Sequence, residues 1–207
     1  MARRLSAAPA RKRADRYHHG DLRRALLQAA VRTIGSHGID GLTLRGVGST
    51  LGVSRTALYR HFTDKAALLA AVAAEGFRTL RAALSESWER GGRGRRGFEA
   101  MGEAYVQFAV AHPSHYRVMF GADIFGAEHA DLAREGAGAF QVLVDAIVEL
   151  QEHALARRDD PRQMALFVWA ATHGVAMLAI DGRLGREPSA IDTLTHYMTD
   201  RVLAAIA

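Results

Sequence analysis

The 207-residue chain contains no cysteine. Disulfide bonds, thiolate nucleophiles, cysteine-ligated zinc and thiol-based redox sensing are therefore all excluded. The chain also lacks any apolar run that approaches the roughly 18 uninterrupted residues of a membrane span. Arg3 and Arg4 stand near the N-terminus without the apolar stretch of a signal peptide, so we expect a cytoplasmic protein.

The motifs of common catalytic centres are missing as well. The sequence has no G-x-S-x-G, no H-E-x-x-H and no P-loop, and its carboxylates fall mostly at predicted caps or solvent-facing helix positions. Residues 91–97, GGRGRRG, contain the spacing G-x-G-x-x-G, but no strand precedes them, and we interpret them as a flexible connector. We therefore predict no enzymatic activity and no cofactor.

Histidines and carboxylates gather in one stretch of the chain. His112 and His115 form an H-x-x-H near a predicted helix start, with Asp123, Glu128 and His129 not far along the sequence. Histidine is the commonest transition-metal ligand. The sequence does not fix the distances between these side chains, however, and we predict no metal site.

Positive charge is concentrated at one end of the chain. The net charge is +5, but residues 1–16 alone carry +5 and residues 17–65 a further +4, which leaves −4 for the remainder. This asymmetry draws a polyanion such as nucleic acid to the N-terminal end. A solvated basic tail without a function is the alternative for residues 1–16.

The pattern of apolar residues is helical throughout. They recur at helical spacing in about nine segments, and no stretch shows the sustained alternation of a strand. The first three segments are 21–37, 43–51 and 54–61. The second and third are short helices joined by the sequence GVS, an outline that is typical of a helix-turn-helix, whose second helix enters the major groove of DNA.

Residues 26–69 resemble the DNA-binding domain of the TetR family of regulators. The resemblance rests on the GVS turn, the LYRHF recognition helix and the K-x-x-L-L that follows it. It implies a DNA-binding domain at residues 17–65, preceded by a basic arm at 1–16. The chain departs from the family at Gly46 and Gly48, and each glycine costs about 0.5–1 kcal/mol in a helix interior, which predicts a weak second helix.

Within this domain the residues divide into core and surface. The residues with core spacing are Leu42, Leu44, Val47, Leu51, Val53, Leu58 and Phe62. Arg55 and Thr56 lie nearest the N-terminus of the recognition helix, where an arginine can bind guanine O6 and N7 and a threonine methyl group can touch thymine. The full set of predicted DNA-binding residues is Thr43, Arg45, Ser54, Arg55, Thr56, Tyr59, Arg60, His61 and Lys65.

Several of these roles come from the resemblance. It implies phosphate contacts for Thr43, Tyr59, His61 and Lys65. Partial packing on the first helix is the alternative for Tyr59, and a surface position without a partner is the alternative for His61. We expect the arm at 1–16 to be disordered without DNA, and to reach a minor groove or raise non-specific affinity when DNA binds.

Residues 66–207 predict a larger helical domain. A long helix begins at about residue 64, and further helices are expected at 98–111, 113–121, 128–156, 161–183 and 189–206. The helix at 161–183 is apolar nearly all round and must be buried on two sides, which favours a two-fold interface built with the last helix. The resemblance implies the same homodimer, and with it a roughly palindromic operator. The predicted fold class is all-α, with a three-helix helix-turn-helix domain and a larger helical bundle for ligand binding and dimerisation.

A second, weaker resemblance concerns ligand binding. The sequences HPSHYRVMFG at 112–121 and WAATHG at 169–174 resemble the Trp-His-Gly type of TetR C-terminal domain. This implies a pocket for a small hydrophobic or amphipathic effector, which prefers a different spacing of the two DNA-binding domains from the one that operator DNA prefers. The candidate pocket residues are Trp88, Met101, Tyr105, Phe108, Tyr116, Met119, Phe120, Trp169, His173 and Met177. Ordinary core packing is the alternative for each of them.

Two functions of different classes follow from these patterns. The first is a TetR-type repressor that binds double-stranded operator DNA as a homodimer and responds to an effector. The second is an architectural DNA-binding protein without an effector, whose C-terminal part serves only dimerisation; a low ratio of specific to non-specific affinity would favour it.

Overall fold

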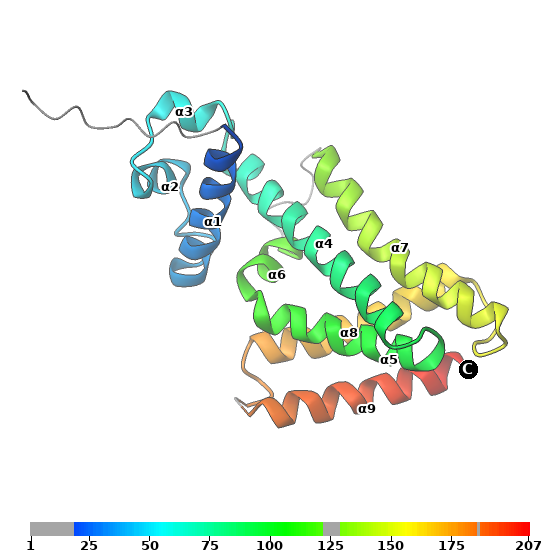
Figure 1. Ribbon diagram of the computed structural model, residues 1–207. Coiled ribbons are helices and arrows are strands. Elements are labelled where there is room, and N and C mark those ends of the chain that lie inside the picture. Colours follow the sequence, from blue (N-terminus) through cyan, green and yellow to red (C-terminus); the bar gives the residue numbers. More distant parts are fainter. Residues whose placement is uncertain (1–18, 122–128, 186) are drawn as a thin grey trace, which may run out of the picture.

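The computed structural model describes residues 19–121, 129–185 and 187–207 (Figure 1). These residues form nine helices and no strand, which confirms the predicted all-α fold. The basic arm at 1–16 and the candidate ligands Asp123 and Glu128 lie outside the described residues. In chain order the helices are α1 (His19–His37), α2 (Leu44–Thr50), α3 (Arg55–Tyr59), α4 (Lys65–Arg90), α5 (Gly94–Ala111), α6 (Pro113–Met119), α7 (Ala130–Glu152), α8 (Pro161–Ile180) and α9 (Pro188–Ile206).

The first three helices form a small domain with capped helix starts. At the start of α2, Gly46 N donates a hydrogen bond of 3.0 Å to Thr43 Oγ1, and at the start of α3, Ala57 N donates one of 3.3 Å to Ser54 Oγ. Between the two helices Gly52 has φ +63°, a left-handed conformation that glycine adopts without strain. The predicted core lies between the helices, with Leu42, Leu44, Val47, Leu58 and Phe62 buried and Leu51 and Val53 partly buried.

Glycine in α2 has a packing role. The helix forms over seven residues although it contains Gly46 and Gly48. Gly48 is buried, and a Cβ atom at this position would lie 3.0 Å from Leu58 Cδ2. The absence of a side chain therefore lets α2 approach α3 closely, which gives this departure from the family pattern a structural reason.

Helix α4 belongs to both parts of the molecule (Figure 1). Its first turn is capped by Asp64, whose carboxylate accepts a 2.8 Å hydrogen bond from Ala67 N. Its early turns pack on α1 and bury Leu68, while its later turns pack on α5, α6 and α7 and bury Leu80 and Leu84. Helix α4 therefore connects the first three helices to the C-terminal part.

The segment GGRGRRG is not a flexible connector, and the sequence-based expectation is wrong. Helix α5 begins inside it at Gly94, so only a tight turn separates α4 from α5. In this turn Arg93 N donates a 3.0 Å hydrogen bond to Trp88 O, and Arg93 Nε donates one of 2.9 Å to Glu149 Oε1 on α7. These bonds hold the turn against two neighbouring helices.

Helices α5 to α9 and the later turns of α4 enclose the C-terminal core. Helix α5 packs on α8 and α9, and α8 also packs on α7 and α9. Pro113 and Pro161 stand in the first turns of α6 and α8, where a missing backbone N–H leaves no hydrogen bond unmade. The largest fully buried side chains of this core include Tyr116, Ile147, Leu150 and Ile206.

One side of α8 remains uncovered. Among the described helices, α8 is the one that is long and apolar enough to cross a membrane by length and composition. Its inner side buries Met164, Val168 and Val175 in the core. On its outer side Leu166 and Phe167 are 45% and 51% exposed. The sequence predicts burial of this helix on two sides. Within the single chain one side is buried and the other is exposed to solvent.

Candidate nucleic-acid interface and ligand cavity

The recognition helix α3 presents polar side chains to solvent. The exposed residues of α3 and its C-terminal cap are Arg55, Thr56, Tyr59 and Arg60. Leu58 is the buried residue of α3 and faces the domain core. Tyr59 is 43% exposed, so its ring packs only in part on the domain. Because α3 is short and begins at the Ser54 cap, Arg55 and Thr56 stand at the helix end that meets base edges in a helix-turn-helix.

The start of α2 adds to this exposed surface. Thr43 and Arg45 are both exposed, and the hydroxyl oxygen of Thr43 already accepts the capping bond from Gly46 N. Ser54 is exposed and makes the corresponding bond in α3. Both caps therefore fix the helix starts, and leave the hydroxyl protons free to donate to an acceptor such as a phosphate oxygen.

Lys65 and His61 are more enclosed than the sequence suggested. Lys65 is half-buried, and its Nζ donates a 2.8 Å hydrogen bond to the carbonyl oxygen of Ile39. His61 is half-buried and lines a cleft of about 200 Å³ between α1, the segment that follows α3, α4 and the start of α7. The phosphate contacts of Lys65 and His61 stay predictions. Within the chain, Lys65 bonds to Ile39 O and His61 lines the cleft next to α4.

A cavity of about 250 Å³ lies within the C-terminal part. Helices α4, α5, α7, α8 and α9 and the end of α6 contribute to its wall. The wall is formed by Phe77, Leu80, Leu84, Phe98, Met101, Gly102, Tyr105, Met119, Phe120, Gly136, Ala139, Phe140, Leu143, Val168, Trp169, Thr172, Met198, Thr199 and Val202. Among the described residues that form the wall there is no Asp, Glu, Lys, Arg or His, so an apolar molecule meets no charged group from this part of the chain.

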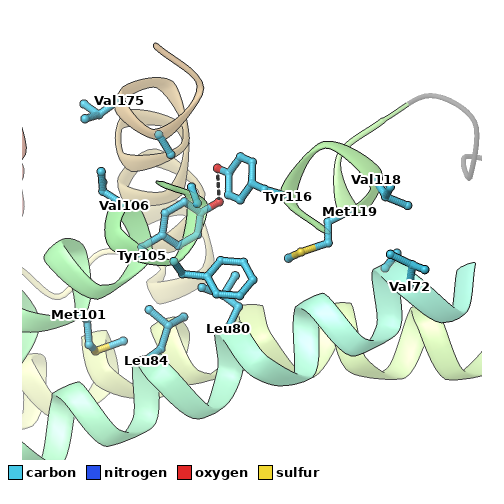
Figure 2. Close-up of a cluster of buried hydrophobic side chains, with 14 of the residues drawn as sticks. Val72, Leu80, Leu84, Met101, Tyr105, Val106, Tyr116, Val118, Met119 and Val175 are labelled. Carbon is cyan, nitrogen blue, oxygen red and sulfur yellow. Dashed lines mark hydrogen bonds between the residues drawn. The ribbon is translucent and has the colours of Figure 1, made fainter. Parts of the chain in front are cut away.

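A hydrogen-bonded cluster of aromatic side chains forms the polar part of this region. Tyr105 Oη receives hydrogen bonds from Trp169 Nε1 at 2.9 Å and from Tyr116 Oη at 3.0 Å. His173 Nδ1 lies 2.7 Å from Tyr116 Oη and 3.3 Å from Tyr105 Oη. Figure 2 shows the hydroxyl groups of Tyr105 and Tyr116 facing each other, joined by a dashed line. The cluster joins three helices, α5, α6 and α8, at one end of the cavity.

Burial keeps this cluster uncharged at neutral pH. Desolvation raises the pKa of Tyr105 to about 12, an effect that the hydrogen bonds from Tyr116 and Trp169 partly oppose. Desolvation also raises the pKa of Tyr116 and lowers the pKa of His173, which favours the neutral imidazole. The cluster therefore offers hydrogen-bonding groups without a formal charge.

The predicted ligand-binding residues separate into three groups. Met101, Tyr105, Met119, Phe120 and Trp169 line the cavity. Tyr116 and His173 are hydrogen-bonded to its wall through Tyr105. The remaining three, Trp88, Phe108 and Met177, do not line it and pack in the surrounding core.

Sequence reasoning missed much of the wall. Phe77, Leu80 and Leu84 of α4 line the cavity, but nothing in the sequence marks them as part of a cavity. Phe140 from α7 and Met198 from α9 were assigned to no site. Periodicity shows which residues share a helix face, whereas the wall depends on which faces meet.

The histidines near α6 do not form a metal centre among the residues described. The rings of His112 and His115 have centroids 6.0 Å apart at nearly perpendicular orientation. No group of three His, Asp or Glu side chains is placed to hold a metal ion within the described ranges. Burial is the main cause that lowers the pKa of His115.

Helix α6 contacts both the cavity and the N-terminal helices. Met119 lines the cavity, and a Cβ atom on Gly76 of α4 would lie 2.4 Å from its sulfur. At the other end of α6, Ser114 Oγ lies 3.1 Å from the position that a Cβ atom on Gly35 of α1 would take. Helix α6 therefore lies between the cavity and α1, in contact with both.

Two family models match the chain. Residues 26–72 match the model described as bacterial regulatory proteins of the tetR family. Residues 98–202, about half of the chain, match the model described as the tetracyclin repressor-like C-terminal domain. The second match includes Trp169, His173 and Gly174, on which the resemblance to the Trp-His-Gly type rested.

Individual proteins agree with these matches. The HTH-type transcriptional repressor AcnR from Corynebacterium diphtheriae is 35% identical over 65 residues, which are 31% of this chain and 34% of the relative. The match thus spans about a third of the length of that relative. A solved structure of a Rhodococcus sp. RHA1 protein of unknown function is 34% identical, with a TM-score of 0.83, covering 93% of this chain and 99% of that chain.

A more distant structure has the same fold. A TetR family transcription regulator from Marinobacter aquaeolei VT8 has a TM-score of 0.69 at 19% identity, covering 89% of this chain and 95% of that chain. Together with the two family matches and the nine-helix arrangement of the described residues, these likenesses establish that the chain belongs to the TetR family, a family of transcriptional regulators and not of enzymes.

Proposed function

We propose that this TetR-family protein is a repressor that binds a roughly palindromic operator as a homodimer and responds to a small hydrophobic or amphipathic effector. One observation carries the proposal: α4 and α6 wall the apolar cavity and also pack on α1 of the DNA-binding domain. Occupancy of the cavity and the position of the DNA-binding domain are therefore mechanically linked. We assign residues 17–65 to DNA binding, 66–207 to ligand binding and dimerisation, and 1–16 to a basic arm.

DNA contact falls to the exposed polar surface of α2 and α3. Arg55 and Thr56 read base edges, because they occupy the N-terminal end of the recognition helix and are exposed. Thr43, Tyr59 and Arg60 bind phosphate groups around them. Seven basic residues against three acidic ones in 17–65 supply the attraction to the phosphate backbone.

The outer side of α8 supports a homodimer. It exposes Leu166, Phe167 and Leu178, and between them lie the small residues Ala170 and Gly174. A Cβ atom on Gly174 would have no neighbour within 4 Å, so nothing within one chain explains a mid-helix glycine that costs about 1 kcal/mol. A partner helix that approaches closely at Gly174 explains both the glycine and the exposed apolar side chains.

The effector acts through a shift between two spacings of the DNA-binding domains. An apolar molecule in the cavity contacts α4 directly and contacts α6 through Met119, and both helices pack on α1. If the effector binds better to one spacing and the operator to the other, each weakens the binding of the other. The protein acts in the cytoplasm, where DNA and metabolites are both accessible.

The cavity also separates this function from that of an architectural DNA-binding protein. A C-terminal part that serves only dimerisation has no need of an apolar cavity, and unfilled apolar space reduces stability by about 24 cal/mol per Å³ of residual cavity. A cavity of about 250 Å³ is therefore a substantial destabilisation unless a ligand fills it.

The experiment is a fluorescence anisotropy titration of the full chain against the DNA upstream of its own gene, over a series of salt concentrations. Random DNA serves as the competitor. We expect specific binding at least about 1,000-fold tighter than binding to random DNA, with an even number of chains per site. Equal affinity for both DNAs at every salt concentration would instead identify an architectural protein.

A further inference from the structure

The cavity wall selects against charge. A charged group transferred from water into an apolar cavity needs an opposite charge or several hydrogen bonds to offset the loss of its hydration. Among the nearby cations, Arg162 lies with its guanidinium 5.5 Å from the centroid of the Phe140 ring, but it is exposed and does not line the cavity. The described residues of the wall therefore offer no charged partner to a carboxylate, a phosphate or an ammonium group.

The threonine hydroxyl groups of the wall donate their protons to backbone carbonyl oxygens. Thr172 Oγ1 donates a 2.9 Å hydrogen bond to Val168 O, and Thr199 Oγ1 donates one of 2.9 Å to Thr195 O. Both bonds run back along the same helix, as is common for buried threonine. These two residues thus present the cavity with weak acceptors and methyl groups.

Tyr105 is different, because its hydroxyl proton remains available to donate a hydrogen bond to a molecule in the cavity. Its oxygen receives two hydrogen bonds, from Trp169 Nε1 and Tyr116 Oη, which occupy both lone pairs. Because Tyr116 donates its one proton to Tyr105, the 2.7 Å contact between Tyr116 Oη and His173 Nδ1 requires the tautomer in which Nδ1–H donates to Tyr116 Oη. In this tautomer His173 Nδ1, 3.3 Å from Tyr105 Oη, cannot accept the Tyr105 proton. An oxygen atom of a molecule in the cavity would therefore make the better partner for the Tyr105 hydroxyl proton.

The volume of the cavity limits the size of the molecule. An engineered apolar cavity of about 150 Å³ accommodates benzene, with six carbon atoms. In proportion, a cavity of about 250 Å³ accommodates about ten non-hydrogen atoms. The aromatic side chains Phe77, Phe98, Phe120 and Phe140 around it suit an aromatic or a short aliphatic body.

From these features, and resting on the proposed effector function, we propose that the effector is an uncharged, largely hydrocarbon molecule of about ten non-hydrogen atoms whose single oxygen atom accepts a hydrogen bond from Tyr105 Oη. Acids, amines and phosphorylated compounds of the same size are excluded from the cavity by the absence of a charged partner. The site is thus suited to small hydrophobic alcohols, ethers or ketones.

The test uses four probes of nearly equal size in calorimetric titrations of the full chain at pH 7.5. They are 3-phenylpropan-1-ol, n-butylbenzene, 3-phenylpropanoate and 3-phenylpropylammonium. We expect the alcohol to bind at least about 100-fold more tightly than either ion, because burial of an unpaired charge costs several kcal/mol. The Tyr105→Phe variant should bind the alcohol about 10-fold more weakly and butylbenzene with less than a two-fold change.

Unchanged butylbenzene binding shows that the Tyr105→Phe cavity is intact, so a loss confined to the alcohol reports the hydrogen bond. Tyr197→Phe is the matched control, because Tyr197 is 62% exposed on α9 and the same hydroxyl group is removed outside the cavity. Any one of three results would overturn the inference: the ions bind as tightly as the alcohol, the two variants have equal effects, or none of the four probes binds. Operator anisotropy on the same samples tests the repressor function separately: specific DNA binding together with any of these three results removes the inference and leaves the DNA-binding function standing.

Discussion

Arg78 on α4 and Glu135 on α7 form an ion pair, with Arg78 Nη2 3.4 Å from Glu135 Oε1. The glutamate is 5% exposed, and Arg81 and Arg134 also lie within 3.4 Å of its carboxylate. A carboxylate removed from water in this way depends on such partners for its charge. The neighbouring Gly136 lines the cavity, so the cluster ties the helix that carries the DNA-binding domain to a helix that walls the cavity.

Replacement of Glu135 by alanine should lower the free energy of unfolding by about 2 kcal/mol, because hydrogen bonds to a charged group are lost while the arginines regain water. Urea denaturation of both proteins measures this difference. Glu86→Ala is the matched control, since Glu86 pairs with Arg90 at 3.5 Å with both side chains exposed. The Glu86→Ala variant should lose less than about 0.5 kcal/mol of the free energy of unfolding. Similar losses in the two variants would show that the buried cluster does not stabilise the contact between α4 and α7.

The features that the sequence predicted well are local ones. The segments predicted at 43–51 and 54–61 begin at Thr43 and Ser54, and the side chains of these two residues accept the capping hydrogen bonds from Gly46 N and Ala57 N. The core of the first three helices followed from spacing alone. These predictions need only the geometry of one helix or of one short turn.

The features that were missed depend on which helices meet. Trp88 was expected in the pocket, but it packs at the tight turn between α4 and α5, where a Cβ atom on Gly97 would lie 2.9 Å from its ring. The phosphate contact of Lys65 stays a prediction, but its hydrogen bond to Ile39 O, which joins residues 26 positions apart, was not foreseen. No periodicity in the sequence encodes such contacts, because they depend on the packing of separate elements.

Arg55 offers a direct check of base recognition. Its replacement by alanine should weaken operator binding by about 1–3 kcal/mol and relax the preference at one base pair in each half-site, since a bidentate contact to guanine would be lost. Anisotropy titrations against operators with single base changes measure both effects. Arg183→Ala, an exposed arginine beyond the end of α8, is the control for loss of one positive charge. A uniform loss over all sequences, with unchanged preference, would assign Arg55 to the phosphate backbone instead.

The dimer interface can be tested at two positions of α8. Phe167→Asp should leave the folded chain intact, because Phe167 is 51% exposed in the single chain, but should shift the protein to monomers. Gly174→Leu should raise the helix stability of the chain by about 0.5–1 kcal/mol and still weaken the dimer, since the new side chain has open space within one chain only. Sedimentation equilibrium gives the association constant, and thermal unfolding at low concentration gives the chain stability. Dimers of unchanged affinity in both variants would place the interface elsewhere.

His173 makes the stability of the C-terminal part depend on pH. Its ring stacks on Tyr116 with centroids 5.5 Å apart, and burial lowers its pKa below the ordinary value of about 6.5. As the pH falls below about 6.5, the unfolded chain takes up a proton at this position before the folded chain does, so stability is lost toward acid and is fully present above this pH.

The His173→Gln variant retains a hydrogen-bonding side chain but cannot take up this proton. We expect it to be less stable than the parent by a constant amount above pH 7, because neither state of the parent is protonated there. Below about pH 6.5 the difference should narrow by less than about 1.4 kcal/mol per pH unit, as the parent alone loses the contribution of this histidine. Urea denaturation from pH 5 to pH 8 measures the difference. A gap of constant size over the whole range would mean that His173 has the same proton affinity in the folded and unfolded chains, and that the cluster with Tyr105 and Tyr116 accepts a charged imidazole as readily as water does.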